Sequence, residues 1–268
     1  MKWKAVVLDL DGTLLNSKKQ VSARNMKAVL ACHCQGMKII FATARPPRTV
    51  NAFLPKELLE IGAFVYYNGA EVICKKTGYQ FSSYIPAYLT FEIVEFCLHQ
   101  EPDAHVTMEV SDQWFSYKEY DAMTMMKVKL NPLIQPLPEF KKNNATKILL
   151  SGSSPELKRA LMDTFGDKVH LLVTDQNELI QIMPLHTSKE RAVCELCLTY
   201  GIPMESVMVF GDDMNDLGLF QEADYSVAMG NAVAVLKQIA DETTDNNDLD
   251  GVALVLEKYV GQFSYGCN

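Results

Sequence analysis

Two aspartates lie two residues apart in the run Asp9-Leu10-Asp11-Gly12-Thr13. Carboxylates this close repel each other unless a cation or a shared proton compensates their charge. One of them can act as a nucleophile while the other acts as a general acid and base. Gly12 permits a sharp turn and a close approach of the backbone. The alternative is a plain turn after a strand, because Asp, Gly and Thr all favour turns.

A second acidic run spans residues 211–216, with the sequence Gly-Asp-Asp-Met-Asn-Asp. Three carboxylates and one amide within five positions are typical of a site for a hard divalent cation with oxygen ligands. An acidic helix start is the alternative, because Asp is favourable at the N-cap and in the first turn. Together with the first acidic run, this pattern favours a metal or phosphate site.

Thr43 and Lys189 are further candidates for binding a phosphoryl group. Thr43 follows an apolar run, where its hydroxyl could donate to a phosphoryl oxygen, and Arg45 could bind an anion or remain solvated. The run Thr187-Ser188-Lys189-Glu190 fits a capping box with Thr187 at the N-cap. Lys189 then lies in the first turn of a helix, where the helix dipole disfavours a cation. This unfavourable position indicates a bound phosphate, with a solvated lysine as the alternative.

These polar groups follow apolar runs that are typical of strands buried on both faces of a parallel sheet. Such strands are predicted over residues 4–8, 38–42, 64–67, 207–210 and 225–229, and helices over 22–35, 188–200 and after Asp250. This alternation predicts a doubly wound, Rossmann-like α/β core, and ligands bind at the carboxyl edge of such sheets.

The alternation changes between residues 84 and 186, where helices are predicted over 86–100 and 156–165 and strands over 106–110, 114–117, 147–150, 169–174 and 178–183. We therefore predict a split core over residues 1–83 and 187–268, with an inserted α+β cap domain over residues 84–186.

Composition excludes several classes of function. The chain of 268 residues has a net charge of −8, which does not suit non-specific binding to nucleic acid. It contains no apolar run long enough to span a membrane. The N-terminus reaches Asp9 too early for a signal peptide, so a cytoplasmic protein with free thiols is expected. Cys194-x-x-Cys197 is a single pair within a helical pattern, which favours helix packing over a zinc site.

The whole set of motifs resembles the haloacid dehalogenase superfamily of phosphohydrolases, and in particular its Cof-type, type IIB branch with a type C2B cap. The resemblance spans the whole chain. Its most specific motifs are Val-x-Leu-Asp-Leu-Asp-Gly-Thr-Leu at 6–14, Asn-Gly-Ala at 68–70, the acidic run at 211–216, Val-Ala-Met-Gly-Asn-Ala at 227–232 and Asp-Gly-Val-Ala at 250–253.

The resemblance implies a Mg²⁺-dependent phosphatase that forms an aspartyl-phosphate intermediate. Asp9 would be the nucleophile, and Asp11 would protonate the leaving alcohol and then activate water. Asp9, the backbone carbonyl of Asp11 and Asp212 would ligate Mg²⁺, with Asp216 supporting the ion. The residues that would bind phosphate or substrate are Gly12, Thr43, Ala44, Arg45, Asn68, Lys189 and Asn215.

The substrate implied by the resemblance is a small phosphomonoester, such as a sugar phosphate or a phosphorylated cofactor, and a monomer or weak homo-oligomer is expected. Three positions depart from the branch: Asp213 replaces Asn, Ala44 replaces Gly, and Glu190 often replaces Gly. A phosphomutase is an alternative, but it would need a second phosphate site and the predicted cap has one arginine, Arg159. A phospho-receiver lacks an inserted cap, and a binding protein with an inactive site would not need every catalytic group.

Overall fold

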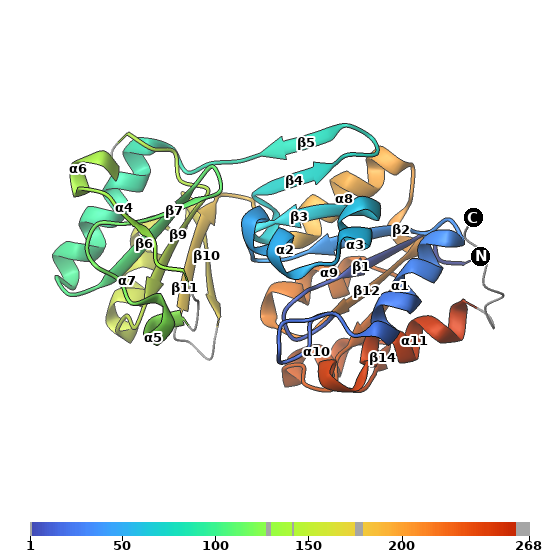
Figure 1. The fold of residues 1–268 in the computed structure, drawn as a ribbon. Coiled ribbons are helices and arrows are strands. Elements are labelled where there is room, and N and C mark those ends of the chain that lie inside the picture. The colour runs from blue at the N-terminus through green and yellow to red at the C-terminus, as the bar shows by residue number, and fades with distance from the viewer. Residues whose placement is uncertain (1, 127–129, 141, 175–178, 261–268) are drawn as a thin grey trace. The chain divides into compact units, whose positions relative to one another are not determined.

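The computed structural model describes residues 2–126, 130–140, 142–174 and 179–260. It divides into two compact units, of which one comprises residues 1–81 and 188–268 and the other residues 82–187 (Figure 1). Within the described residues, no helix is long and apolar enough to cross a membrane.

The first unit contains an eight-stranded sheet in the order β14-β13-β12-β1-β2-β3-β4-β5. All neighbours from β14 to β3 run parallel, and β4 runs antiparallel to β3. The strands are β1 (Ala5–Leu8), β2 (Lys38–Ala42), β3 (Gly62–Tyr66), β4 (Glu71–Cys74), β5 (Tyr79–Ser82), β12 (Val207–Gly211), β13 (Tyr225–Ala228) and β14 (Glu242–Thr243).

Strand β1 lies between β2 and β12, and all four of its residues are buried. Leu8 is level with Phe41 of β2 on one side and with Phe210 of β12 on the other. Because both neighbours run parallel to β1, the three strands end at the same edge of the sheet. The residues that follow their carboxyl ends therefore lie together.

Helices pack on both faces of this sheet (Figure 1). In one group α1 contacts α3 and α11, and in the other α9 contacts α8 and α10. The α-helices of the unit are α1 (Ala23–Cys34), α2 (Pro47–Phe53), α3 (Lys56–Ile61), α8 (Lys189–Tyr200), α9 (Leu217–Glu222), α10 (Ala234–Ile239) and α11 (Gly251–Tyr259). Its 3₁₀ turns are η1 (Tyr67–Gly69), η3 (Met204–Ser206), η4 (Met214–Asp216) and η5 (Asn247–Leu249). The predicted α/β architecture is confirmed.

One local prediction in the core is wrong, and two strands were not predicted. The N-cap of α8 is Ser188, whose hydroxyl accepts a hydrogen bond from the backbone N–H of Arg191, so the capping box built on Thr187 does not form. Strands β4 and β5 were not predicted, because their short, partly exposed sequences lack the apolar runs of the parallel strands.

The second unit contains a six-stranded sheet in the order β10-β11-β9-β6-β7-β8. Its neighbours pair antiparallel, except for the parallel pair of β7 and β8. The strands are β6 (His105–Val110), β7 (Gln113–Ser116), β8 (Leu133–Ile134), β9 (Lys147–Ser151), β10 (Val169–Thr174) and β11 (Leu179–Pro184). The helices are α4 (Ala87–Gln100), α5 (Ala122–Met126), α6 (Leu137–Phe140) and α7 (Pro155–Phe165).

This unit has its own apolar core, to which β6, β9, β11, α4 and α7 all contribute. It is therefore an α+β unit inserted between the two halves of the core. The connection between the strands predicted over residues 169–174 and 178–183 lies outside the described residues.

The cysteines are mostly free thiols, at Cys32, Cys74, Cys97, Cys194 and Cys197. Cys34 is disulfide-bonded, so the expectation of free thiols is wrong at this position. Cys194 and Cys197 lie within α8, and Cys197 is buried in the apolar core.

Candidate active site

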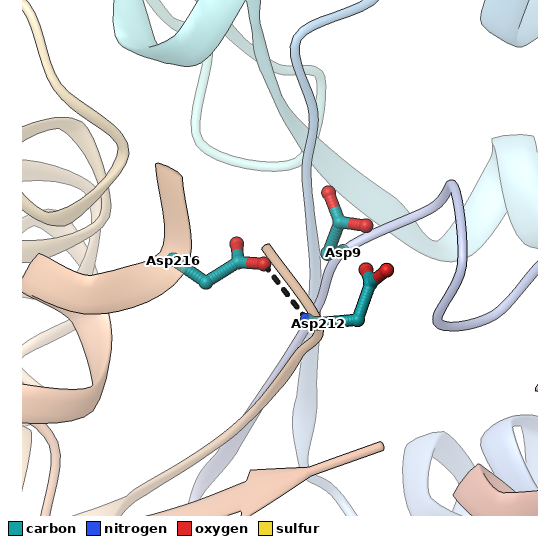
Figure 2. A group of neighbouring side chains, drawn as sticks. All are labelled: Asp9, Asp212 and Asp216. Atoms are coloured by element: carbon teal, nitrogen blue, oxygen red, sulfur yellow. Dashed lines mark hydrogen bonds between the residues drawn. The ribbon is translucent and has the colours of Figure 1, made fainter. Parts of the chain in front are cut away.

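Three acidic side chains meet at the carboxyl edge of the core sheet (Figure 2). Asp9 follows β1, Asp212 follows β12, and Asp216 ends η4 just beyond it. One carboxylate oxygen from each lies within 4.8 Å of the other two. Asp216 also accepts a hydrogen bond of 3.0 Å from the backbone N–H of Asp212, which ties the two together.

Lys189 reaches this cluster from the first turn of α8. Its ammonium Nζ donates to Asp9 Oδ1 at 2.6 Å and to Asp216 Oδ1 at 2.7 Å. The Lys189 and Asp216 side chains are both fully buried, with 0% of their surface exposed. A buried lysine is expensive unless it is paired, and here two carboxylates pair with it.

Burial and crowding shift the pKa values of these groups. Burial, and then the charges of Asp216 and Asp212, hold the pKa of Asp9 well above its ordinary value, although Lys189 opposes the shift. Burial and the charge of Asp216 raise the pKa of Asp212 to about 7. Burial alone would lower the pKa of Lys189, but the charges of Asp216 and Asp9 outweigh burial and raise it.

The cluster fits a divalent cation. Three carboxylates face one ammonium, so two negative charges are uncompensated when all three are ionised. The donors are all oxygens, as Mg²⁺ prefers. The backbone also leaves the space: a Cβ on Gly12, whose φ is +78°, would lie 2.1 Å from Asp212 Oδ2. Glycine is required at position 12 because its backbone has a positive φ and because any side chain there would clash with the Asp212 carboxylate.

The Asp11 carboxylate belongs to a different cluster. Arg45 donates to it through Nε and, at 2.7 Å, through Nη2, and Lys19 Nζ donates to Oδ1 at 2.6 Å. Burial would raise the pKa of Asp11, but the hydrogen bond and charge of Arg45, followed by Lys19, outweigh burial and lower it. The Arg45 guanidinium also lies over the ring of Phe53, 4.8 Å from its centroid.

Hydrogen bonds connect the loops that follow β2, β3 and β12. The Thr43 carbonyl accepts from the Asn68 backbone N–H at 2.9 Å, and the Thr43 hydroxyl accepts from the Arg45 backbone N–H at 3.1 Å. Asn215 Nδ2 donates to Asn68 Oδ1 at 3.0 Å. Ala44 is half-buried between Thr43 and Arg45. Hydrogen bonds thus join Asp9, Lys189, Asp212 and Asp216 in one group. A second group runs from Asp11 through Arg45, Thr43 and Asn68 to Asn215.

Two residues that contact Asp212 were not among the sequence candidates. The Thr13 hydroxyl donates to Asp212 Oδ1 at 3.0 Å. Asn231 Nδ2 donates to the Gly12 carbonyl at 2.8 Å and to Asp212 Oδ2 at 3.3 Å. Thr13 belongs to the run Asp-Leu-Asp-Gly-Thr after β1, and Asn231 belongs to the run Val-Ala-Met-Gly-Asn-Ala at the end of β13. A polar residue in either run could have been found by its position just after a buried strand.

The positions that depart from the type IIB pattern have local contacts. Asp213 is the N-cap of η4, and its Oδ1 accepts from the Met214 backbone N–H at 2.8 Å. Glu190 packs against Gly218, where a Cβ would come within 2.3 Å of the Glu190 carboxyl carbon. Helices α8 and α9 therefore approach each other closely where Glu190 contacts Gly218. The role of Glu190 is this contact between helices, because the capping box predicted for it does not form.

Comparison with known proteins identifies the family. The haloacid dehalogenase-like hydrolase family model matches residues 6–256. The phosphatase YwtE of Bacillus subtilis, named for 5-amino-6-(5-phospho-D-ribitylamino)uracil, is 27% identical over 97% of this chain and 100% of its own length. A putative phosphatase of Haemophilus influenzae is 27% identical over 96% of this chain and 98% of its own.

Solved structures share the fold. TM0651 from Thermotoga maritima superposes with a TM-score of 0.83 at 27% identity, covering 99% of both chains. The subclass IIB sugar phosphatase BT4131 superposes with a TM-score of 0.81 at 21% identity, covering 96% of this chain and 98% of its own. The chain belongs to the haloacid dehalogenase-like hydrolase family, with the fold of subclass IIB. The predicted resemblance and the enzyme class, a phosphoric monoester hydrolase, are confirmed.

Proposed function

We propose that this enzyme hydrolyses small phosphorylated metabolites through a phosphoaspartyl intermediate on Asp9, with Mg²⁺ as its cofactor. The observation that carries the proposal is the buried contact of Lys189 with Asp9 and Asp216 beside Asp212. Phosphoryl transfer needs positioning and charge stabilisation above all, and this cluster offers a carboxylate nucleophile, a fixed cation and a metal site in one place.

In the proposed first step an Asp9 oxygen attacks phosphorus, and the bond from phosphorus to the leaving alkoxide breaks. Asp11 gives its proton to that oxygen, so the alcohol departs neutral. In the second step Asp11 takes a proton from water as the water oxygen attacks phosphorus. The bond from phosphorus to Asp9 then breaks, which releases inorganic phosphate and regenerates the Asp9 carboxylate.

The proposed binding residues surround these two acids. Lys189 and Thr43 would hold the phosphoryl oxygens, together with Gly12 and Ala44, and Asn215 would lie near them. Asn68 and Arg45 would lie near the rest of the substrate. Asp9, the Asp11 carbonyl and Asp212 would hold Mg²⁺, with Asp216 supporting the ion. When bound, Mg²⁺ supplies positive charge that stabilises the phosphoryl oxygens as charge develops on them.

The proposed substrates are small organic phosphates. The Bacillus relative is named for a ribityl phosphate, and the subclass IIB neighbour is a sugar phosphatase. The inserted unit supports a small substrate over a polyanion, because residues 84–185 contain 14 acidic and 9 basic residues. We propose that the core over residues 1–83 and 187–268 carries the chemistry and that residues 84–186 select the substrate, in a cytoplasmic monomer or weak homo-oligomer.

The test is release of inorganic phosphate from a panel of sugar phosphates, ribityl phosphates, flavin mononucleotide and pyridoxal phosphate, with Mg²⁺ or with EDTA. Asp9→Asn is the matched variant, since it keeps the size of the side chain. Release that needs both Mg²⁺ and Asp9 supports the proposal. Isomerisation of a hexose phosphate without release would favour the phosphomutase, and binding without either reaction would favour a regulatory protein.

A further inference from the structure

The Asp212 carboxylate accepts a hydrogen bond on each of its two oxygens. The Thr13 hydroxyl donates to Oδ1 at 3.0 Å, and Asn231 Nδ2 donates to Oδ2 at 3.3 Å. These donors come from the loop after β1 and the loop after β13, whereas Asp212 itself follows β12. The proposed mechanism uses Asp212 as a metal ligand and gives Asn231 no role.

The Asn231 amide is bonded at both of its ends. Nδ2 also donates to the Gly12 carbonyl at 2.8 Å, and Oδ1 accepts from the Asn247 backbone N–H at 3.0 Å. A carbonyl can only accept and a backbone N–H can only donate, so the reversed amide would place like groups against each other at both ends. The orientation that directs Nδ2 at Asp212 is therefore fixed. Because Asn231 is exposed, burial does not force these contacts on it.

The backbone brings Asn231 to this place. Strands β12 and β13 are parallel neighbours, so the loops that follow them begin side by side. The Met229 N–H donates to the Gly211 carbonyl at 3.1 Å, and the Val233 N–H donates to the Asp212 carbonyl at 2.9 Å. These two bonds flank Asn231 in the sequence and hold its loop along the loop that carries Asp212. The side chain at position 231 therefore begins beside the acidic cluster.

A second tether joins the same network without contacting Asp212. Asn247, the first residue of η5, donates from Nδ2 to the Leu15 carbonyl at 2.8 Å. The contacts among Gly12, Asn231, Asn247 and Leu15 thus form a ring that the chain closes through residues 12–15. The Asn247 side chain anchors this ring at a distance from the carboxylate. Its removal therefore separates the anchoring of the loops from direct contact with Asp212.

We propose that Asn231 is a positioning residue that orients the Asp212 carboxylate for the divalent cation. The inference rests on the proposed function, in which Asp212 is a ligand of Mg²⁺. With Asn231 on one oxygen and Thr13 on the other, the plane of the carboxylate is set before an ion binds. Hydrogen-bond partners of a metal ligand typically contribute about 10–100-fold to metal affinity. The Asn231 contact, at 3.3 Å, is at the long end for N–H···O bonds, so the lower figure is expected.

The experiment compares Asn231→Ala with Asn247→Ala as its matched control. Mg²⁺ affinity is measured by calorimetry at a fixed pH, and thermal unfolding is followed in EDTA and in Mg²⁺. We expect Asn231→Ala to raise the Kd for Mg²⁺ about tenfold and Asn247→Ala to change it less than about twofold. Mg²⁺ should accordingly raise the Tm of Asn231→Ala less than that of the wild type or of the control, because stabilisation by a ligand follows its affinity. Asn231→Leu, which keeps the branched shape without the donors, should match Asn231→Ala.

The possible failures are distinguishable. If the wild type binds Mg²⁺ and both Asn231 variants bind it as tightly, the role of Asn231 is overturned while the proposed cofactor stands. Equal losses of affinity in Asn231→Ala and Asn247→Ala would also overturn it, because the effect would then come from anchoring the loops. A wild type that binds no Mg²⁺ would refute the proposed cofactor, and the role of Asn231 with it.

Discussion

Replacement of Lys189 by methionine tests the electrostatics of the buried cluster. The Lys189 ammonium contacts Asp9 and Asp216, and its side chain is fully buried. Methionine keeps much of the length and volume of the side chain but removes the charge. The variant therefore leaves two buried carboxylates that have lost their shared cation.

The expected loss of stability is large. Removing one partner of a buried charge pair typically costs about 3–5 kcal/mol, because the remaining charge stays buried without compensation. For domains of roughly 150–250 residues, each kcal/mol lowers Tm by about 2–4 °C. The metal-free variant should therefore unfold about 10 °C below the wild type. Arg191→Met is the control on the same helix: it breaks an exposed pair with Glu195 and should cost less than about 1 kcal/mol.

The assay is thermal unfolding in EDTA and in Mg²⁺ at two pH values. Lys189 lowers the pKa of Asp9, so its removal raises that pKa further above its ordinary value. A carboxyl group whose pKa is raised in the folded state favours folding below that pKa, and this contribution is lost as the pH rises through it. The deficit of the variant should therefore shrink when the pH falls from about 8 to about 5, and also when Mg²⁺ replaces the missing charge. If neither the lower pH nor Mg²⁺ reduced the difference in unfolding temperature between the variant and the wild type, the electrostatic explanation would be wrong. The lost stability would then come from packing.

Two other predictions concern the metal site. Mg²⁺ affinity, measured by calorimetry, should rise by at least about tenfold per pH unit below about 7, because Mg²⁺ must displace the proton that Asp212 binds with a pKa of about 7, and the pKa of Asp9 is raised as well. Thr13→Val removes a hydrogen bond that lowers this pKa, so it should move the profile to higher pH; an unmoved profile would show that another group titrates. Gly12→Ala should abolish Mg²⁺ binding and turnover, because the new Cβ would meet the Asp212 carboxylate. Gly78→Ala is its control, with a similar φ of +73° and open space around it, and should lose stability but keep activity.

The core could be predicted largely from local patterns. Apolar runs such as residues 4–8 mark strands buried on both faces, and the polar residues that end them identified the sheet edge that carries Asp9 and Asp212. Strands β4 and β5 were not predicted, because partly exposed strands have no continuous apolar run. The N-cap of α8 was misplaced by one residue, since Thr187 and Ser188 are both good caps and only the backbone conformation decides between them.

The site was predictable in composition but not in pairing. The sequence pattern identified Asp9, Asp212, Asp216 and Lys189 as candidate site residues. The fold explains why a lysine is stable in the first turn of a helix, because two buried carboxylates accept hydrogen bonds from it. The pairing of Asp11 with Lys19 depends on a loop conformation with positive φ, for which a lysine gives no signal. The role of Asn231 depends on the packing of the loop after β13 against Gly12, a contact across more than 200 residues of sequence.

The most direct test of the central claim is to trap the covalent intermediate. The enzyme is mixed with Mg²⁺ and its best substrate, quenched in acid, and treated with borohydride, which reduces an aspartyl phosphate to homoserine. Peptide mass spectrometry then locates the modified position. The proposed mechanism predicts homoserine at position 9, absent when Mg²⁺ or substrate is left out. Homoserine at another carboxylate, or none during rapid phosphate release, would contradict Asp9 as the nucleophile.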